Sequence, residues 1–376
     1  MRVIHLPTAV GGNPQGISKH LKILGVKSET WTLSQNYFAY SADNVIYKAN
    51  QGLFIRELKR ILALRYIFRA DIVFFNFGMG LFNPFPNIYS KNILFKILIT
   101  PYNYYSYVMA LLEVKLLKFF GKIIFIQYQG DDARQGDFCK ENFAITFAER
   151  VEPGYYSKKT DEAKRRSIAF YAKNADKIYA LNPDLLHVLP NTSEFLPYSH
   201  ISLSEWTPAY TQLDDRPLRI GHAPSHRKAK GTDFILDAVQ ELISAGYKFE
   251  LVLIEGMSNA EAKEVYKTVD VLIDQLFAGW YGGLAVEAMA LGKPVIAYIR
   301  QEDLHFIPAQ MRADLPIIQA EPSSIRDVLE DILKMPRTEL LKNAQRSRAY
   351  VEKWHDPMII AKRIKLDMEY ALDKKV

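Results

Sequence analysis

Short apolar runs alternate with helix-like segments along most of this chain. Runs rich in β-branched and aromatic residues predict buried strands at Arg2–Leu6, Asp71–Phe75, Lys122–Tyr128 and Lys177–Leu181. Helical segments separate these runs, and the first, over Ile17–Leu24, follows a Gly-Gly-Asn-Pro turn. Strands that alternate with helices predict a mostly parallel sheet with helices on both faces.

The alternation pauses at Leu196–Asp215, where prolines and acidic residues are typical of a linker. It then resumes, and the last segment, Pro357–Asp373, predicts one amphipathic helix. Two doubly wound α/β domains are therefore expected, with a ligand bound in the cleft between them at the carboxyl ends of the strands. The elements expected in the second half are strands at Leu218–His222, Phe249–Ile254, Val269–Asp274 and Val295–Tyr298, a helix at Thr232–Ser244, and a helix opened by the Ser258–Glu261 capping box.

Length and composition limit the possible classes of protein. A chain of 376 residues is long enough for two domains, and its 49% hydrophobic content indicates a globular chain rather than a disordered one. Cys139 is the single cysteine, which excludes an internal disulfide. The first residues lack the layout of a signal peptide and no run is long enough to span a membrane, so we expect a cytoplasmic protein. The net charge of +6 is compatible with phosphate-bearing ligands or an anionic membrane surface.

The run Ala278–Tyr298, AGWYGGLAVEAMALGKPVIAY, has the strongest pattern for ligand binding. Glycines at Gly279, Gly282 and Gly283 permit a close backbone approach, and a helix that begins near Gly283 favours an anion at its amino end. Glu287 lies roughly 6–8 Å further along at about 1.5 Å per residue, which is close to the distance from a pyrophosphate to a ribose diol. The alternative is a helix start that needs glycine, with Glu287 exposed. The small apolar neighbours of Glu287 oppose that alternative, because a carboxylate buried among them needs a partner.

A second candidate is the loop HAPSHRKAKGT, His222–Thr232, which follows a strand and precedes a helix. Arg227 and Lys230 are the expected phosphate contacts, and Lys228 is a third candidate. Gly231 permits a tight turn, and we expect Thr232 or Asp233 to cap the next helix. The alternative is a solvated basic loop.

Two turns of the first half complete the candidates. Gly11, Gly12 and Asn13 follow the first strand and could line the same cleft, although such residues are common in ordinary turns. The run QGDDARQGD, at residues 129–137, follows another strand. Its Asp131 and Asp132 could bind acceptor hydroxyls or act as a base, or they could form a charged turn with an internal Asp–Arg pair.

Other patterns argue against common site classes or leave two interpretations open. The histidines have no metal-ligand spacing, and neither a P-loop nor a dinucleotide-binding glycine motif occurs. Asn87–Lys122 is aromatic and basic, and Lys158–Arg166 is basic. Such stretches suit contact with a membrane surface, but an aromatic core helix with snorkelling lysines has the same composition.

Together HAPSHRKAKGT, FELVLIE, VDVLIDQ and GGLAVEAMALGKPVIAY resemble the donor-binding half of the GT-B retaining glycosyltransferases of family four. EAMALGKPV is the most specific piece. The resemblance is clear over Leu218–Tyr298 and looser over the amino-terminal glycine turn, ALNPDLL and the tail VEKWHDP. It implies an acceptor-side domain over 1–200, joined by a returning helix at 357–376, and a donor-binding domain over 201–356.

The resemblance also implies roles for residues. Glu287 would hold the donor ribose, while Arg227, Lys230 and the N–H groups near Gly283 and Leu284 would hold the pyrophosphate. Gly12 would lie over the diphosphate and the donor sugar, and Asp274 would help position the donor. No metal or other cofactor is implied, because the cations and the helix dipole neutralise the leaving diphosphate.

The expected protein is a hexosyltransferase-type enzyme of polysaccharide, glycolipid or cell-envelope biosynthesis that acts with retention. Its partners would be a nucleotide-sugar donor and a saccharide or lipid-linked acceptor. Peripheral contact of the protein with the inner membrane surface is a further expectation, and no nucleic acid is expected. One departure is Gly279, which stands where relatives often have a first glutamate, eight residues before Glu287. Another is the missing amino-terminal histidine, whose place QGDDAR takes. A non-catalytic nucleotide-sugar-binding subunit and a nucleotide-sugar epimerase therefore remain alternatives.

Overall fold

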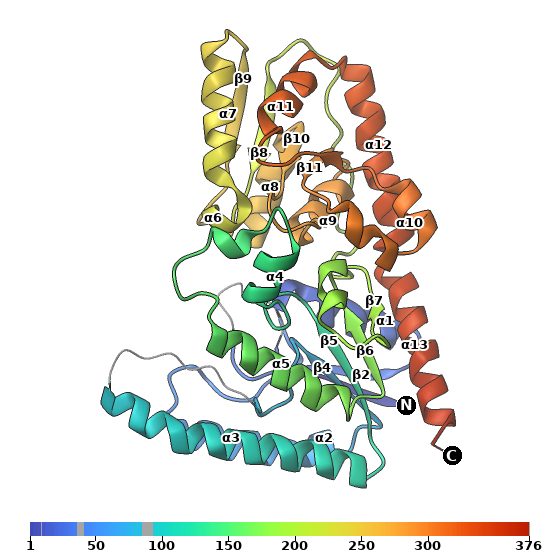
Figure 1. Cartoon of the computed structure of the whole chain (residues 1–376). Coiled ribbons are helices and arrows are strands. Elements are labelled where there is room, and N and C mark those ends of the chain that lie inside the picture. The colour runs from blue at the N-terminus through green and yellow to red at the C-terminus, as the bar shows by residue number, and fades with distance from the viewer. Residues whose placement is uncertain (9, 36–40, 85–92, 376) are drawn as a thin grey trace. The chain divides into compact units, whose positions relative to one another are not determined.

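The computed structural model describes residues 1–8, 10–35, 41–84 and 93–375, and its contacts divide the chain into two compact units. Unit 1 comprises Met1–Asp137, Tyr156–His200 and Pro357–Val376, and unit 2 comprises Phe138–Tyr155 and Ile201–Asp356. The chain therefore passes from one unit to the other several times (Figure 1). The grouping of Phe138–Tyr155 with unit 2 was not expected from the sequence.

Unit 1 is built on a seven-stranded sheet with the order β3-β2-β1-β4-β5-β6-β7, and each described pair of neighbouring strands is parallel. The expected parallel α/β sheet is confirmed, and β2, β3 and β7 are additions to it. The strands of unit 1 are β1 (Arg2–Leu6), β2 (Lys27–Thr32), β3 (Asn44–Val45), β4 (Ile72–Asn76), β5 (Ile123–Tyr128), β6 (Lys177–Ala180) and β7 (Glu194–Phe195).

Helices cover both faces of this sheet because successive strand residues point to opposite sides. On one face, Val3 and Phe74 pack against α1 (Asn13–Ile23) and α13 (Pro357–Asp373). On the other face, Ile4 and Phe75 belong to a core formed with α2 (Leu53–Ile67), α3 (Ile93–Phe119) and α5 (Lys158–Ala172). The 3-10 helices Val10–Gly12 and Pro183–His187 are the shorter elements, and α4 (Gly136–Asn142) crosses the boundary between the units.

Unit 2 has a five-stranded parallel sheet with the order β12-β11-β10-β8-β9. Its strands are β8 (Leu218–His222), β9 (Phe249–Leu253), β10 (Val271–Ile273), β11 (Val295–Ala297) and β12 (Ile318–Gln319). Its helices are α6 (Arg227–Lys230), α7 (Thr232–Ser244), α8 (Asn259–Thr268), α9 (Gly283–Ala290), α10 (Ala309–Asp314), α11 (Ile325–Lys334) and α12 (Arg337–Trp354), with 3-10 helices at Phe147–Glu149 and Gln301–Phe306.

The stretch expected as a linker is packed rather than free. It contains no helix after β7, yet Leu196, Ser199, Ile201 and Trp206 are all buried. Apolar side chains lie between the prolines of this stretch, and they anchor it first to unit 1 and then to unit 2. Within the described residues, no helix is long and apolar enough to cross a membrane.

Candidate functional site

Asp274 joins the two motifs of unit 2 that the sequence singles out. It lies directly after β10 and is fully buried. One carboxylate oxygen accepts a hydrogen bond from Lys230 Nζ at 2.6 Å, and the other accepts from the backbone N–H of Gly282 at 2.5 Å. The basic loop after β8 and the glycine turn before α9 therefore meet at the carboxyl ends of β8 and β10, where parallel sheets bind ligands.

Lys230 is held in this cluster with part of its donor capacity still available. Its side chain is 15% exposed, and its ammonium also donates to Gln275 Oε1 at 2.9 Å. An ammonium has three N–H donors, so one remains for a phosphate oxygen. A Cβ added at Gly282 would lie 3.3 Å from the Asp274 carboxylate and 3.5 Å from Lys230 Nζ, so glycine leaves room beside the cation.

The first turn of α9 begins directly beside this cluster, with Gly283 and Leu284 as its first residues. Among the described residues, no side chain caps this end of α9, and its first turn contains no acid. Uncapped N–H groups and the positive end of the helix dipole favour an anion. Lys230 and the start of α9 thus present positive charge at neighbouring positions.

Glu287 is buried in α9, with 7% of its surface exposed. Its Oε1 accepts a hydrogen bond from Asn259 Nδ2 at 3.1 Å. The expectation that this carboxylate would be buried is met, but the protein itself supplies a hydrogen-bond donor to it. Asn259 was missed in the sequence, where it appears only as the residue after the helix-capping Ser258.

The other cations of the basic loop are bound to acids at the surface. Arg227 is half-exposed and pairs with Glu255, with Nε 2.8 Å from Oε1, and Lys228 lies 3.2 Å from Glu152. The structure therefore separates Lys230, which lies inside the cluster, from Arg227 and Lys228. The expected cap of α7 by Thr232 or Asp233 is wrong: Gly231, with a φ of 79°, is the N-cap residue and no side chain of the described part caps α7.

Thr232 instead binds His222, whose two ring nitrogens lie 2.9 Å from the Thr232 hydroxyl and the Ile273 carbonyl. Burial lowers the pKa of His222 to about 4, so the ring is neutral.

A small hollow of about 190 Å³ opens at the start of α7 beside Lys228. The guanidinium of Arg150, which also lines this hollow, lies 5.5 Å from the ring centroids of Phe234 and Phe277.

Gly279 has no room for a side chain. Its φ is 79°, and a Cβ there would lie 2.5 Å from Nη1 of Arg300. Arg300 is itself buried; its Nη1 donates to Asp303 at 2.9 Å and its guanidinium lies 3.6 Å from the centroid of the Phe143 ring. The glycine at the position of the relatives' first glutamate therefore accompanies an arginine that fills the adjoining space.

The aromatic residue of the turn, Tyr281, is fully buried and serves as an anchor. Its hydroxyl lies 2.9 Å from the Tyr350 hydroxyl and 2.9 Å from His355 Nε2. These partners lie at the end of α12, far from Tyr281 in the sequence. Tyr350 and His355 thus hold the turn between β10 and α9 in place through the Tyr281 hydroxyl.

In unit 1, the glycine turn lies at the carboxyl end of β1 and opens α1. Gly11 and Gly12 have φ values of 66° and 70°, which favour glycine. Asn13 is buried, and its Oδ1 accepts from the backbone N–H of Ser199 at 2.9 Å. The structure therefore commits the Asn13 side chain to its own unit, while the two glycines shape the entry to α1.

Asp131 and Asp132 follow β5, as expected, but they have different surroundings. Asp132 accepts from the N–H groups of Gln129 at 3.0 Å and Gly130 at 2.6 Å, and burial raises its pKa to about 6. Asp131 accepts from the Tyr156 hydroxyl at 2.5 Å. Arg134, the arginine of this turn, pairs with Asp184 at 2.6 Å, and Asp131 also attracts its guanidinium.

Three polar residues that the sequence reasoning missed lie on the α1 face at the carboxyl ends of β1, β4 and β5. His5, Asn76 and Gln127 are each at most 1% exposed. Among the described residues, no partner is found for either ring nitrogen of His5, either amide atom of Gln127 or Oδ1 of Asn76. Burial lowers the pKa of His5 to about 3, so this imidazole is neutral. A polar residue inside an otherwise apolar strand is the signal that could have found them.

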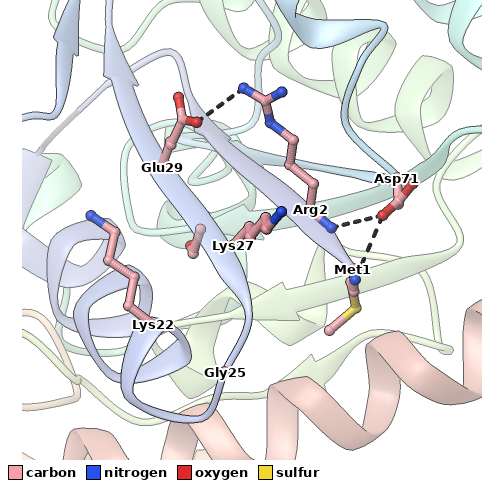
Figure 2. A pocket seen from close by; sticks show the side chains of 8 residues that line it. Met1, Arg2, Lys22, Gly25, Lys27, Glu29 and Asp71 are labelled. Carbon is pink, nitrogen blue, oxygen red and sulfur yellow. Dashed lines mark hydrogen bonds and ion pairs between the residues drawn. The ribbon is translucent and has the colours of Figure 1, made fainter.

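A pocket also lies at the opposite edge of the unit 1 sheet, at the amino ends of its strands. Figure 2 shows its lining at the amino ends of β1 and β2, including Arg2, Lys27 and Glu29. Its charges are largely paired: Arg2 lies 3.0 Å from Glu29, and its backbone N–H donates to Asp71 at 2.7 Å. In doubly wound sheets ligands bind at the carboxyl ends, so this pocket is not the candidate site.

Comparison with solved structures defines the class of fold. The matches include GT-B glycosyltransferases over the full chain, so this chain has the GT-B fold, as the resemblance in the sequence implied. No protein-family model matches the chain, and no curated protein is significantly similar to it.

Three of the matching structures illustrate the likeness. Sucrose-phosphate synthase from Thermosynechococcus elongatus is 14% identical, with 100% of both chains covered and a TM-score of 0.62. HepE from Anabaena in complex with UDP-glucose is 12% identical, with 98% of this chain and 99% of that chain covered and a TM-score of 0.60. The catalytic domain of starch synthase IV from Arabidopsis thaliana, bound to ADP and acarbose, is 10% identical, with 99% of each chain covered and a TM-score of 0.61. Identities this low establish the fold alone.

Proposed function

We propose that this protein is a glycosyltransferase that moves a sugar from a nucleotide-diphosphate-sugar donor to a saccharide, glycolipid or other glycoconjugate acceptor, with retention of anomeric configuration. The observation that carries the proposal is the cluster of Asp274, Lys230 and the uncapped start of α9, with Glu287 buried one turn further along. HepE and starch synthase IV, which share the fold, are complexed with UDP-glucose and with ADP, which supports a nucleotide-sugar donor here.

In this proposal the protein stabilises the diphosphate as it leaves. The bond between the sugar's anomeric carbon and the diphosphate oxygen breaks, and the acceptor hydroxyl oxygen forms the new bond to that carbon. The third N–H of Lys230 and the N–H groups of Gly283 and Leu284 bind the negative charge that develops on the diphosphate. Arg227 adds a second cation when it exchanges Glu255 for phosphate. Fixed cations and N–H donors of this kind require no metal ion.

Glu287 would accept hydrogen bonds from the two hydroxyls of the donor ribose, because its carboxylate has acceptor capacity beyond the bond from Asn259. For unit 1, we propose that Gly11 and Gly12 contact sugar hydroxyls. Asp131 and Asp132 are the candidate bases for the acceptor proton. The raised pKa of Asp132 suits proton transfer near neutral pH.

A non-catalytic nucleotide-sugar-binding subunit is the second candidate function. The observation that favours it is Gly279 with the adjoining Arg300, because the relatives' first glutamate is absent and its space is filled. Both candidates bind the donor, and only the first transfers its sugar. Detection of released nucleotide diphosphate together with a glycosylated acceptor eliminates the second candidate.

The test is a thermal-shift screen of UDP-, GDP-, CDP- and TDP-sugars, followed by calorimetry with the best ligand. A ligand that binds the native state alone raises the melting temperature. We expect Glu287→Gln to weaken binding about 10- to 100-fold, since charge-assisted hydrogen bonds to the diol are lost. Glu264→Gln, which changes an exposed acid on α8, is the matched control and should leave the affinity unchanged. Equal affinities of Glu287→Gln and the control would contradict the proposed role of Glu287.

A further inference from the structure

Helix α2 presents a stripe of apolar side chains to solvent. Phe54 is 81% exposed, and Leu58, Ile61 and Leu62 are each more than two-fifths exposed. Their spacing of four, seven and eight residues from Phe54 places them on one side of the helix. The other side carries Ala63 and Ile67, which are buried in the core of unit 1. An amphipathic helix normally has polar residues on its solvent side. The exposed apolar side chains of α2 therefore do not contribute to the core of unit 1.

Helix α3 repeats this arrangement. Tyr104, Leu112, Leu116 and Phe119 are exposed, and Phe119 reaches 81%. They follow the same helical spacing, while Ala110, Val114 and Leu117 on the opposite side are buried in the core. The aromatic stretch predicted from the sequence is therefore not a core helix on all sides over its described part. Residues 87–92 of that stretch lie outside the described residues.

The two stripes belong to one surface, here called the α2–α3 face. In Figure 1, α3 lies along one border of unit 1, with α2 behind it in this view. The Tyr102 hydroxyl on α3 donates to Glu57 on α2 at 3.1 Å, and the rings of Phe68 and Phe120 at the far end lie 5.5 Å apart. Because both helices turn their buried sides to the same core, their exposed sides point away from it together.

The charges on this face have one sign. Residues 53–70 and 99–122, all of which the structure describes, include two acids, Glu57 and Glu113. Glu113 is buried, and Glu57 lies 2.8 Å from Arg60 in a largely buried pair. The cations Arg65 and Lys115, in contrast, are exposed among the apolar residues. The solvent side of the α2–α3 face is thus apolar and basic.

We propose that the α2–α3 face binds the surface of an anionic lipid bilayer. Exposed aliphatic and aromatic residues interspersed with cations are the features of helices that lie in the membrane interface, where the apolar groups enter the acyl boundary and the cations meet anionic headgroups. A second copy of this chain is a poorer occupant, since two such faces would bring like charges together without acids to pair them. The protein would lie on the membrane, because none of its described helices spans one.

The experiment is co-sedimentation of the full chain with two kinds of vesicle, phosphatidylcholine alone and equal parts of phosphatidylcholine and phosphatidylglycerol. Wild type should bind the anionic vesicles preferentially. Substitution of both Phe54 and Phe119 by Gln should lower the partition coefficient at least about tenfold, because the apolar area that enters the lipid is lost. Substitution of Arg65 and Lys115 by Gln should lower binding to the anionic vesicles by about fivefold per cation.

The matched control is the double substitution Leu366→Gln and Tyr370→Gln on α13, where two side chains are similarly exposed in the same unit. It should bind vesicles as wild type does. Phe119→Trp gives a direct readout, since its added tryptophan emission should shift to shorter wavelength with anionic vesicles. The proposal is overturned if the Phe54/Phe119 variant sediments as wild type does, or if these substitutions instead dissociate a dimer that never binds vesicles.

The membrane proposal does not depend on the proposed glycosyltransferase activity. The exposed positions of the α2–α3 face lie in unit 1, and the nucleotide screen reports on the cluster in unit 2. Nucleotide binding by the Phe54/Phe119 variant should therefore equal that of wild type. Loss of vesicle binding with intact nucleotide binding, or the reverse, shows which of the two proposals has failed.

Discussion

Replacement of Asp274 by Asn tests whether this carboxylate holds the candidate site together. Asn keeps an acceptor of similar shape but removes the charge that faces Lys230 at 2.6 Å. Removal of one partner from a buried ion pair generally costs about 3–5 kcal/mol, because the other charge stays buried. Lys230 retains its hydrogen bond to Gln275 and is 15% exposed, so we expect a smaller loss than for a fully buried pair, about 2–3 kcal/mol.

The assay is thermal unfolding, in which a unit of this size shifts by about 2–4 °C per kcal/mol, so Asp274→Asn should lower the melting temperature by roughly 4–12 °C. Asp327→Asn, which changes an exposed acid of the same unit, should leave it unchanged. The double variant Asp274→Asn with Lys230→Met should recover part of the loss, since no unpaired cation remains. The single variant Lys230→Met completes the comparison. If Asp274→Asn unfolds at the same temperature as the control, or if the double variant loses as much stability as the two single variants together, the pairing of Asp274 with Lys230 does not stabilise the fold.

Two further predictions concern the cores of the units. Burial raises the pKa of Glu113, whose carboxylate accepts from two backbone N–H groups, to about 7. The native state therefore keeps a proton that the unfolded chain has lost, and stability should fall by about 3 kcal/mol as the pH rises from 4.5 to 7. Urea midpoints across this range should show that fall, and Glu113→Gln should flatten it; an unchanged slope would refute the assignment to Glu113. Gly279→Ala should destabilise by about 2–3 kcal/mol, because it combines left-handed strain with a clash against Arg300. Gly246→Ala is the matched comparison, because Gly246 has a φ of +92° but no neighbouring atom that an added Cβ would meet. Equal melting temperatures for the two variants would mean that the Arg300 side chain moves aside without cost.

Much of the fold could be predicted because its elements have strong local signals. The strand at Leu218–His222 and the helices at Thr232–Ser244 and Pro357–Asp373 have the predicted bounds. The strand β2, Lys27–Thr32, was missed because its sequence KSETWT is polar, and its place follows from pairing with β1 rather than from local hydrophobicity. Long-range packing of this kind has no periodic signal in a single sequence.

The sequence could locate those parts of the candidate site that have a local motif, namely the basic loop with Lys230 and the glycine turn before α9. The pairing of Asp274 with Lys230 depends on the neighbouring positions of β8 and β10 in the sheet, which no local pattern specifies. The roles of Asn259 and Arg300 likewise depend on contacts between residues distant in sequence. The sequence therefore identified loops with suitable chemistry, and the fold determined which of their side chains meet.

The helix α13 gives the chain a constraint on the order of its own folding. Ile360, Ile364 and Met368 of this last helix fill the same core as Val3 and Ile17 from the first strand and helix. The strand β1 and the helix α1 are therefore made long before the helix that completes their core, and until α13 has been made their apolar side chains cannot pack against it.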